Sequence, residues 1–401
     1  AAAVGASSTL IFCVVGLFTG ISAGNSVVIS QSRGAGDKEQ TDMALHSAIT
    51  FGLVAGLLLM VIAVALAPWV LRLMKSPENV YPLARVYMQI YFLSMPATVL
   101  YNMASGALNA IGDSVTPFRV LVFCGFLNVA LDALFVRVIP LGVAGVAIAT
   151  LLCQTVSMAI LLGILLKGRE GLKLQIHNLG IDRDILERIL RIGLPAGFQT
   201  IVIAFSNAMV QYFINGYGEL EVAAFATYFK VENLIYLPIL AVGSAASTFA
   251  GQNTGAKNYR RIRKGTLLLA FMGASITVMI AILLLLTSHT VFGLFINDRE
   301  VVGLTIIIAG VTFPFYFIYP VMEACGGALR GMGYAICSMI ITISCMCMAR
   351  VSILAFLSTV FHSIEAVASV YPITWALAAI SFAVLFSFVI NGKMKKEEDL
   401  L

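Results

Sequence analysis

The chain has 401 residues, of which 60% are hydrophobic and 11% are charged, and its formal net charge is +5. A water-soluble globule of this size would have too few polar side chains to cover its surface, so the composition excludes a soluble protein. A transmembrane β-barrel is also excluded, because barrel strands alternate apolar and polar residues, whereas the apolar segments of this chain are apolar on every face.

Eleven apolar segments follow one another along the chain. Each has about 20 residues or more, and at about 1.5 Å per residue such a helix crosses the ~30 Å hydrocarbon core of a membrane. In chain order they are residues 3–29, 45–70, 82–109, 118–137, 141–166, 192–215, 222–250, 266–290, 302–329, 335–358 and 365–391. We therefore predict an all-α membrane protein.

The reactive residue types do not cluster in the sequence. The seven cysteines lie inside the apolar segments, where cysteine commonly acts as a small buried hydrophobe, and the four histidines lie at or near segment ends. Cys345 and Cys347 form a C-x-C pair, but no His or acidic residue stands nearby to complete a zinc site. We therefore expect no metal, no cofactor and no catalytic residue, and a protein that is not an enzyme.

The sequence matches itself at a constant offset of 221 residues. SVVISQSRGA (26–35) aligns with STFAGQNTGA (247–256), and GALNAIG (106–112) aligns with GALRGMG (327–333). The segment LMKSPENV (73–80) also falls on LFINDREV (294–301), a loop on a loop. Three matches at one spacing indicate an internal duplication.

The first repeat starts late relative to the second. At the same offset Ala1–Ser8 aligns with Val222–Phe229, so the predicted span within residues 193–221 has no counterpart in the first repeat. We therefore expect that the first helix is missing, which agrees with the absence of an initiating Met. The full architecture would have 12 helices, 11 of them visible here, in two parallel six-helix repeats that form two lobes.

These repeats predict four parts of the chain. They are an N-lobe over residues 1–166, a linker over 167–191, a C-lobe over 192–391 and a tail over 392–401. Most Lys and Arg residues, including those of the linker and the tail, fall on one side of the predicted membrane. Since basic segments stay in the cytoplasm, we predict that the linker and the C-terminus are cytoplasmic.

The linker contains a predicted short helix. Asp182 can cap it, and apolar side chains at helical spacing give it one apolar face, namely Ile185, Leu186, Ile189 and Ile192. Such a tether would lie on the cytoplasmic face and would let the two lobes move against each other.

The candidate ionisable residues inside the predicted spans, away from the span ends, are Asp132, Lys230, Glu232, Glu323 and Arg350. Each needs a reason, because a charge at mid-membrane costs about 2.5–3.5 kcal/mol or more. In the sister repeat none of their equivalents is charged, and only Glu323 has an amide counterpart, Asn102. The shared scaffold therefore does not require these charges, which indicates a function. Gln199 and Asn207 add neutral polar groups.

Lys230 and Glu232 cannot pair with each other, because two residues are separated by about 200° around a helix. Lys230 can extend toward the outer interface, whereas the shorter Glu232 is a candidate functional acid. Glu323 follows Pro314 and Pro320, which bend helices, and bent helices near mid-membrane are common at transport sites. Arg350 is a candidate counter-ion for Glu323 or for Asp132.

With these residues the chain resembles the multidrug and toxic compound extrusion (MATE) family over essentially its whole length. The motifs that carry the resemblance are ISQSRGAGD (29–37), YNMASGALNAIGDSVTP (101–117), IGLPAG (192–197), YLPI (236–239), FAGQNTGAKN (249–258) and MEACGGALRGMGYAICSMII (322–341). The resemblance implies a multi-pass transporter of the bacterial plasma membrane that exports organic, often cationic, compounds by antiport with H⁺ or Na⁺.

The resemblance also implies roles for individual residues. Glu232 and Glu323 match positions where the second lobe of family members carries an acid. Tyr319 stands where some subfamilies carry Asp, which argues against a Na⁺ site of that type. The first-helix acid of many members lies outside this chain.

The sequence therefore predicts a secondary active transporter in which carboxylates between two lobes exchange a proton or Na⁺ for substrate. Aromatic and Met side chains such as Phe198, Tyr236, Tyr316 and Met322 would add adaptable apolar surface. The expected substrate- and ion-binding residues are Glu323, Glu232, Asn102, Asp132, Arg350, Lys230, Tyr101, Tyr319, Gln199 and Asn207.

Two other functions fit parts of the sequence. A lipid-linked sugar flippase of the same superfamily would have extra helices and a strongly cationic cleft, and a channel or scaffold would not obviously need asymmetric charges on a duplicated frame. The expected partners are small organic substrates, H⁺ or Na⁺ and membrane lipids. We expect no nucleic acid partner and a monomer.

Overall fold

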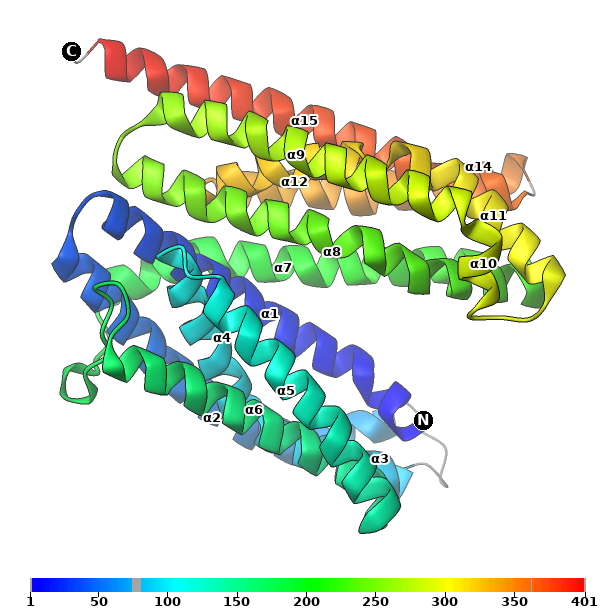
Figure 1. Ribbon diagram of the computed structural model, residues 1–401, viewed down its shortest axis with the longest axis horizontal. Helices are drawn as coiled ribbons and strands as arrows, with labels where there is room; N and C mark the ends of the chain where they lie inside the picture. Colours follow the sequence, from blue (N-terminus) through cyan, green and yellow to red (C-terminus); the bar gives the residue numbers. More distant parts are fainter. Residues whose placement is uncertain (1, 74–80, 362, 400–401) are drawn as a thin grey trace. The chain divides into compact units, whose positions relative to one another are not determined.

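The computed structural model describes residues 2–73, 81–361 and 363–399, and most of them are helical (Figure 1). Helices cover all eleven predicted spans, several of them with more than one helical element. Among these residues nine helices are long and apolar enough to cross a membrane, or ten if the bent pair at 299–331 is one span. Most of the loop 73–80 used in the repeat alignment lies outside the described residues. The predicted all-α membrane architecture is confirmed.

The chain divides into two compact units, and the boundary lies between Phe198 and Gln199, inside a single helix. Unit 1 ends at Phe198 and contains α4, which packs against α1, α2 and α6. Its elements are α1 (Ala2–Gly34), α2 (Lys38–Leu73), α3 (Tyr81–Leu93), α4 (Met95–Ala110), α5 (Val115–Ala133), η1 (Leu134–Val138), α6 (Gly142–Lys167), η2 (Ile176–Asn178) and the first part of α7 (Arg183–Ile214).

Unit 2 begins at Gln199 and is built around α12, which packs against α8, α9 and α15. Besides the second part of α7, its elements are α8 (Glu219–Gly255), α9 (Tyr259–Leu286), α10 (Ser288–Gly293), α11 (Arg299–Thr312), η3 (Phe313–Phe315), α12 (Ile318–Gly331), α13 (Ala335–Thr342), η4 (Ile343–Ala349), α14 (Arg350–Val360) and α15 (Ile364–Glu398).

The two units repeat the same close helix contact. In unit 1 the backbone of Gly106 on α4 lies against α1 at Ser22, so that an added Cβ would strike the Ser22 carbonyl. In unit 2 Gly327 on α12 lies against α8 at Gly243 in the same way. Both pairs are related by the 221-residue offset. Small residues let helix backbones approach closely in membranes, which explains why GAL is kept in both copies of the motif.

The predicted span 82–109 is two helices in the structure, α3 and α4, which meet at Ser94. Pro96 stands at the beginning of α4, where its missing backbone N–H costs nothing. Hydropathy alone could not reveal this interruption, because both helices are apolar.

The predicted short linker helix is instead the beginning of the long helix α7. Asp182 caps it as expected, since its Oδ1 accepts a hydrogen bond from Ile185 N at 2.9 Å. The helix then continues without interruption to Ile214, and its first part packs on α1, where Gly24 lies against the Ile189 carbonyl. Ile189 is fully buried. This part of the linker is therefore packed within unit 1 and does not lie free on a membrane surface.

Two further interruptions shape unit 2. The span that contains Pro314 and Pro320 bends by 50° between η3 and α12, as the two prolines predict. In the next span the helix widens to a π-helix over Ile343–Ala349, immediately before Arg350. π-helical segments are uncommon and often lie at functional sites, and both of these interruptions place side chains of the site described below.

Candidate functional site

Glu232 lies in the interior of unit 2 and is bound by a tyrosine. The Tyr316 hydroxyl, located at the bend between η3 and α12, donates a hydrogen bond to Glu232 Oε1 on α8. One turn earlier on α8, the Tyr228 hydroxyl is 3.4 Å from the Tyr316 hydroxyl. Both tyrosines are fully buried. The carboxylate therefore ends a chain of phenolic hydroxyls that could carry a proton to or from it.

Arg350 is the second ionisable group of this region, and it is 2% exposed. Its guanidinium donates hydrogen bonds to Thr374 Oγ1 on α15 at 3.3 Å and to Asn207 Oδ1 on α7 at 3.3 Å. Its charge also lies over the Tyr371 ring, 5.0 Å from the ring centroid. All of these partners are neutral, so they satisfy the hydrogen bonds of the guanidinium without cancelling its charge.

Trp375 on α15 connects the two ionisable groups. Its ring centroid is 4.5 Å from that of Tyr316, and it is 5.9 Å from that of Tyr371. Thr374, which binds Arg350, is its neighbour in sequence. We call this set the inner cluster; its members are Asn207, Tyr228, Glu232, Tyr316, Arg350, Tyr371, Thr374 and Trp375.

The inner cluster contains one acid, the half-buried Glu232, and one base, the buried Arg350. A buried charge is costly unless an opposite charge offsets it. Protonation of Glu232 would leave the Arg350 charge alone within the cluster, whereas ionised Glu232 balances it. The protonation state of Glu232 therefore decides the net charge of the inner cluster.

Glu323 is not a member of the inner cluster. Its Oε2 is 3.2 Å from Arg330 Nη2, and the two side chains are 13% and 16% exposed. Both residues belong to α12, and seven residues are almost two helical turns, so they lie on the same face. The carboxylate occupies the space beside Gly243, where a side chain would collide with it. In unit 1 the equivalent space is filled by Ser22.

Within unit 2, Arg350 is not paired with Glu323, the first of the two acids for which it is a candidate counter-ion. Its hydrogen-bond partners are Thr374, Asn207 and Met346, and Glu323 is paired with Arg330 instead. Arg350 directly follows a π-helix and its side chain reaches Thr374 on α15, a direction that sequence spacing does not reveal.

The remaining candidates of unit 2 lie in separate places. Tyr319 is buried and its ring packs edge-on against Tyr236 and against Trp375, at centroid distances of 5.7 and 5.5 Å. Gln199 is buried and donates a hydrogen bond to Thr342 Oγ1 at 2.7 Å. Tyr319 therefore borders the inner cluster, whereas Gln199 fastens α7 to α13.

Lys230 points away from the inner cluster. It is exposed, and its Nζ lies 5.8 Å from the ring centroid of Phe295, in the loop that follows α10. A lysine that reaches along its own helix to an aromatic side chain of a loop is the arrangement expected for a side chain that extends to the membrane interface.

The candidates of unit 1 do not meet each other in a single cluster. Asp132 on α5 has a buried Oδ1 that accepts no hydrogen bond from the described residues, and Tyr87 lies within electrostatic range of it. Asn102 donates to the carbonyl of Thr98 on its own helix at 2.8 Å. Tyr101, its neighbour, is half-buried. Asp132 is thus the acid of unit 1 with an unused acceptor.

Sequence reasoning did not identify half of the inner cluster. Tyr228, Tyr371, Thr374 and Trp375 were not singled out, because an aromatic residue in an apolar helix usually serves packing alone. Tyr316 was expected to provide apolar surface, but its hydroxyl binds Glu232. Its place beside Pro314, where the helix is interrupted, was the available signal.

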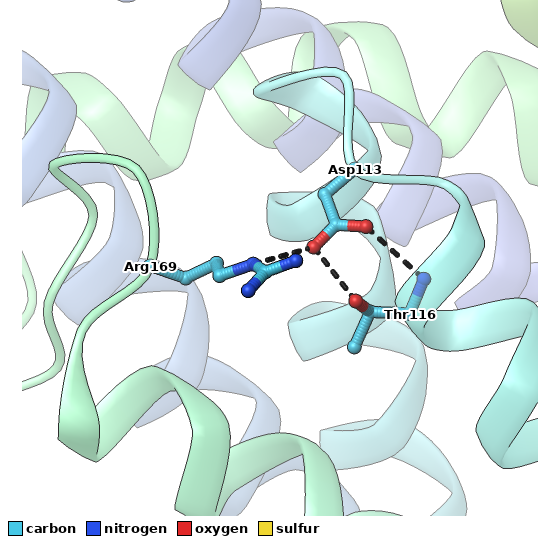
Figure 2. Close-up of polar contacts among 3 residues, drawn as sticks. All are labelled: Asp113, Thr116 and Arg169. Carbon is cyan, nitrogen blue, oxygen red and sulfur yellow. Dashed lines mark hydrogen bonds and ion pairs between the residues drawn. The ribbon is translucent and has the colours of Figure 1, made fainter.

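A further acidic residue organises a loop of unit 1 (Figure 2). Asp113 follows α4, and its carboxylate accepts hydrogen bonds from Thr116 N and Thr116 Oγ1 and from Arg169 Nε, the last at 2.9 Å. Arg169 lies in the connection between α6 and α7, and its neighbour Glu170 offers its carbonyl to Arg33 at 2.7 Å. The Asp113 carboxylate therefore joins two loops at one end of unit 1.

We expect Asp113→Asn to lower the free energy of unfolding by about 1 kcal/mol at neutral pH. The expected loss is modest because the Arg169 side chain is half exposed. Burial alone would raise the pKa of Asp113, but the hydrogen bonds from Thr116 and Arg169 and the Arg169 charge outweigh it, so this pKa is lowered. A carboxyl group whose pKa is lowered by folding stabilises the fold at every pH above its pKa in the unfolded chain, which is about 4. This stabilisation is lost as the pH falls through the pKa of the folded state.

The melting temperature of the detergent-solubilised protein, measured between pH 3 and pH 8, checks this prediction. The difference between the parent and Asp113→Asn should shrink toward the acid end, while Glu187→Gln on the exposed face of α7 should have no effect at any pH. A difference that stays constant with pH would contradict the role given to the ionised carboxylate.

The chain is similar in sequence to known proteins. The MatE family profile matches residues 1–134 and 195–357. The probable multidrug resistance protein YoeA of Bacillus subtilis is 28% identical over 401 residues, covering 98% of this chain and 86% of YoeA. Another B. subtilis protein, the probable multidrug resistance protein YpnP, is 32% identical over 262 residues, 64% of this chain and 57% of YpnP.

A solved structure agrees with these sequence matches. The outward-facing conformation of a multidrug resistance MATE family transporter of the MOP superfamily superposes with a TM-score of 0.94 at 23% identity, covering 98% of this chain and 88% of that one. At this identity the likeness concerns the fold. Since the family profile covers well over half of the chain, the protein belongs to the MATE family of multidrug efflux transporters, whose members are transporters and not enzymes.

Proposed function

We propose that this protein exports organic cations or amphiphiles by proton antiport with alternating access, and that Glu232 is the group that carries the coupling proton. The observation that supports the proposal is the position of Glu232, a carboxylate in the interior of unit 2 that is hydrogen-bonded to Tyr316 and shares its cluster with Arg350. Protonation of a carboxylate in such a place needs no other ligand.

The neighbours of Glu232 favour a proton over Na⁺. A sodium ion in a protein needs several oxygen ligands and a negative surrounding, whereas the inner cluster already contains the positive guanidinium of Arg350. A second cation placed there would be repelled at low dielectric. An additional acid near the cluster would be needed to offset that repulsion. Tyr319, which borders the cluster, provides only a neutral hydroxyl.

The other functions considered from the sequence have less support. The similar proteins are named as multidrug resistance proteins, which does not favour a lipid-linked sugar flippase, and family membership argues against a channel or a scaffold. We further propose a monomer in the bacterial plasma membrane with a cytoplasmic C-terminus, in line with the distribution of Lys and Arg. A fluorescent protein fused to the C-terminus, which matures only in the cytoplasm, would stay dark if this orientation were wrong.

The proposed activity can be tested in liposomes that contain the purified protein. We expect an acidic interior to drive uptake of a cationic dye from outside, and an imposed Na⁺ gradient at equal pH to drive none. Preloading with unlabelled substrate should accelerate dye entry, because a carrier exchanges substrates and a channel does not. Uptake driven by Na⁺ alone would contradict the choice of proton, and the absence of exchange would contradict a carrier mechanism.

A further inference from the structure

One end of unit 2 carries a dense group of basic residues from two helices that are far apart in sequence. The Nζ of Lys393 lies 6.0 Å from the ring centroid of Tyr259, the first residue of α9, so the beginning of α9 and the end of α15 are neighbours (Figure 1). We call this surface the basic end; its members are Lys257, Arg260, Arg261, Arg263, Lys264, Lys393, Lys395 and Lys396.

The basic end has more bases than acids, eight against three. All of its members except the half-buried Lys393 are exposed. The first turn of α9 contains no acidic residue, although acids are the side chains that a helix N-terminus favours. The acids of these two segments are Glu397, Glu398 and Asp399, in the last residues of the chain. A strong local excess of positive charge therefore remains, which favours binding of an anion.

The sister repeat shows that the scaffold does not require these bases. At the 221-residue offset, Arg260 and Arg263 correspond to Glu39 and Asp42 at the beginning of α2, and Lys393 corresponds to Leu172. The equivalent helix of unit 1 begins with Lys38 and thus carries acids at two positions where α9 carries arginines. A general preference for basic residues on one side of the membrane would act on both copies alike, so a specific role of the second copy explains the difference better.

The basic end adjoins a surface that faces lipid chains. Within about two turns of the last base on α9, Leu268 and Phe271 are exposed, the latter by 71%. On α15, Val384 and Phe388 are exposed before Lys393, Phe388 by 78%. Exposed apolar side chains on membrane-spanning helices contact acyl chains, so the bases lie at the level of the phospholipid headgroups.

We propose that the basic end is a binding site for the phosphate headgroups of anionic phospholipids. Arginine binds phosphate through two parallel hydrogen bonds, and four neighbouring bases on the first two turns of α9 can contact more than one headgroup. The site lies wholly within unit 2 and uses none of the residues assigned to export, so it does not depend on the proposed function.

The experiment measures binding by the full-length chain in neutral detergent, as the rise in melting temperature on titration with lipid. We expect phosphatidylglycerol to stabilise the parent and phosphatidylcholine to have little effect. In the variant Arg260→Gln/Arg261→Gln/Arg263→Gln/Lys264→Gln the phosphatidylglycerol concentration for half of the effect should rise on the order of tenfold or more. A matched control removes four exposed bases of unit 1, Lys167→Gln/Lys173→Gln/Arg183→Gln/Arg191→Gln, and should respond like the parent.

Each outcome of this test decides the proposal. Equal loss of the lipid effect in both quadruple variants would overturn it, since any basic surface would then suffice. Stabilisation of the parent by millimolar inorganic phosphate to the same extent would overturn it in favour of a free-anion site. If the α9 variant does not fold, the salt dependence of the parent protein tests the proposal. Stabilisation by phosphatidylglycerol must then weaken steeply between 50 mM and 500 mM salt, and an effect independent of salt would overturn the proposal.

Discussion

Substitution of Glu232 by Gln should abolish proton-driven export while leaving the protein folded. Glutamine has the shape of a protonated glutamate and can still accept the hydrogen bond of Tyr316, but it cannot release a proton. The net charge of the inner cluster is then the same at every pH. A pH gradient can therefore no longer drive transport by protonating and deprotonating this residue. We expect dye uptake driven by an acidic liposome interior to fall to the level of liposomes without protein.

Two variants separate this effect from general damage. Glu219→Gln, at the exposed first residue of α8, should retain the parental rate, because it makes the same chemical change on the same helix outside the inner cluster. Tyr316→Phe removes only the hydroxyl and should shift the pH dependence of uptake without abolishing it. Parental proton-driven uptake by Glu232→Gln would show that the coupling proton is carried elsewhere, with Asp132 as the next candidate.

Substitution of Arg350 should have the largest effect on stability. Arg350→Ala removes a side chain that is 2% exposed and leaves Thr374 and Asn207 without their donor. Loss of a large buried side chain, or of one member of a buried charged network, costs about 3–5 kcal/mol. Arg350→Met keeps the apolar stem, so its melting temperature should fall less than that of Arg350→Ala, but proton-driven uptake should be lost in both.

The double variant Glu232→Gln/Arg350→Met tests whether the two groups act together. If the Arg350 charge balances ionised Glu232, removal of both should cost less stability than the sum of the single changes. Melting temperatures of the four proteins provide this comparison, and Arg299→Met, an exposed arginine on α11, is the control for loss of one positive charge. Full additivity, or normal transport by Arg350→Met, would remove Arg350 from the mechanism.

The architecture was predictable because membrane helices have strong sequence signals. About 20 apolar residues in a row predict a span, and the 221-residue offset predicted equivalent contacts, such as those of Gly106 and Gly327. Single local features were also predictable where one residue determines the backbone. Asp182 caps α7, and Pro314 with Pro320 marks the 50° bend.

The arrangement of the site was less accessible from the sequence. The π-helix at Ile343–Ala349 has no sequence signature, and the hydrogen bonds that Arg350 makes directly after it, with Thr374 and Asn207, could not be inferred from helical spacing. The Tyr316 hydroxyl could not be distinguished from the many aromatic side chains that pack helices. By contrast, the pair of Glu323 and Arg330 could have been found, since a separation of seven residues places both on one face of α12.

The chain contains two tryptophans, and their surroundings differ sharply. Trp69 on α2 is 62% exposed, whereas Trp375 is 2% exposed and stacks edge-on against the tyrosine that binds Glu232. Indole emission responds to nearby charge and polarity, so a protein with Phe at position 69 would report optically on the inner cluster alone. Turnover could then be followed by intrinsic fluorescence, without a dye or an attached label.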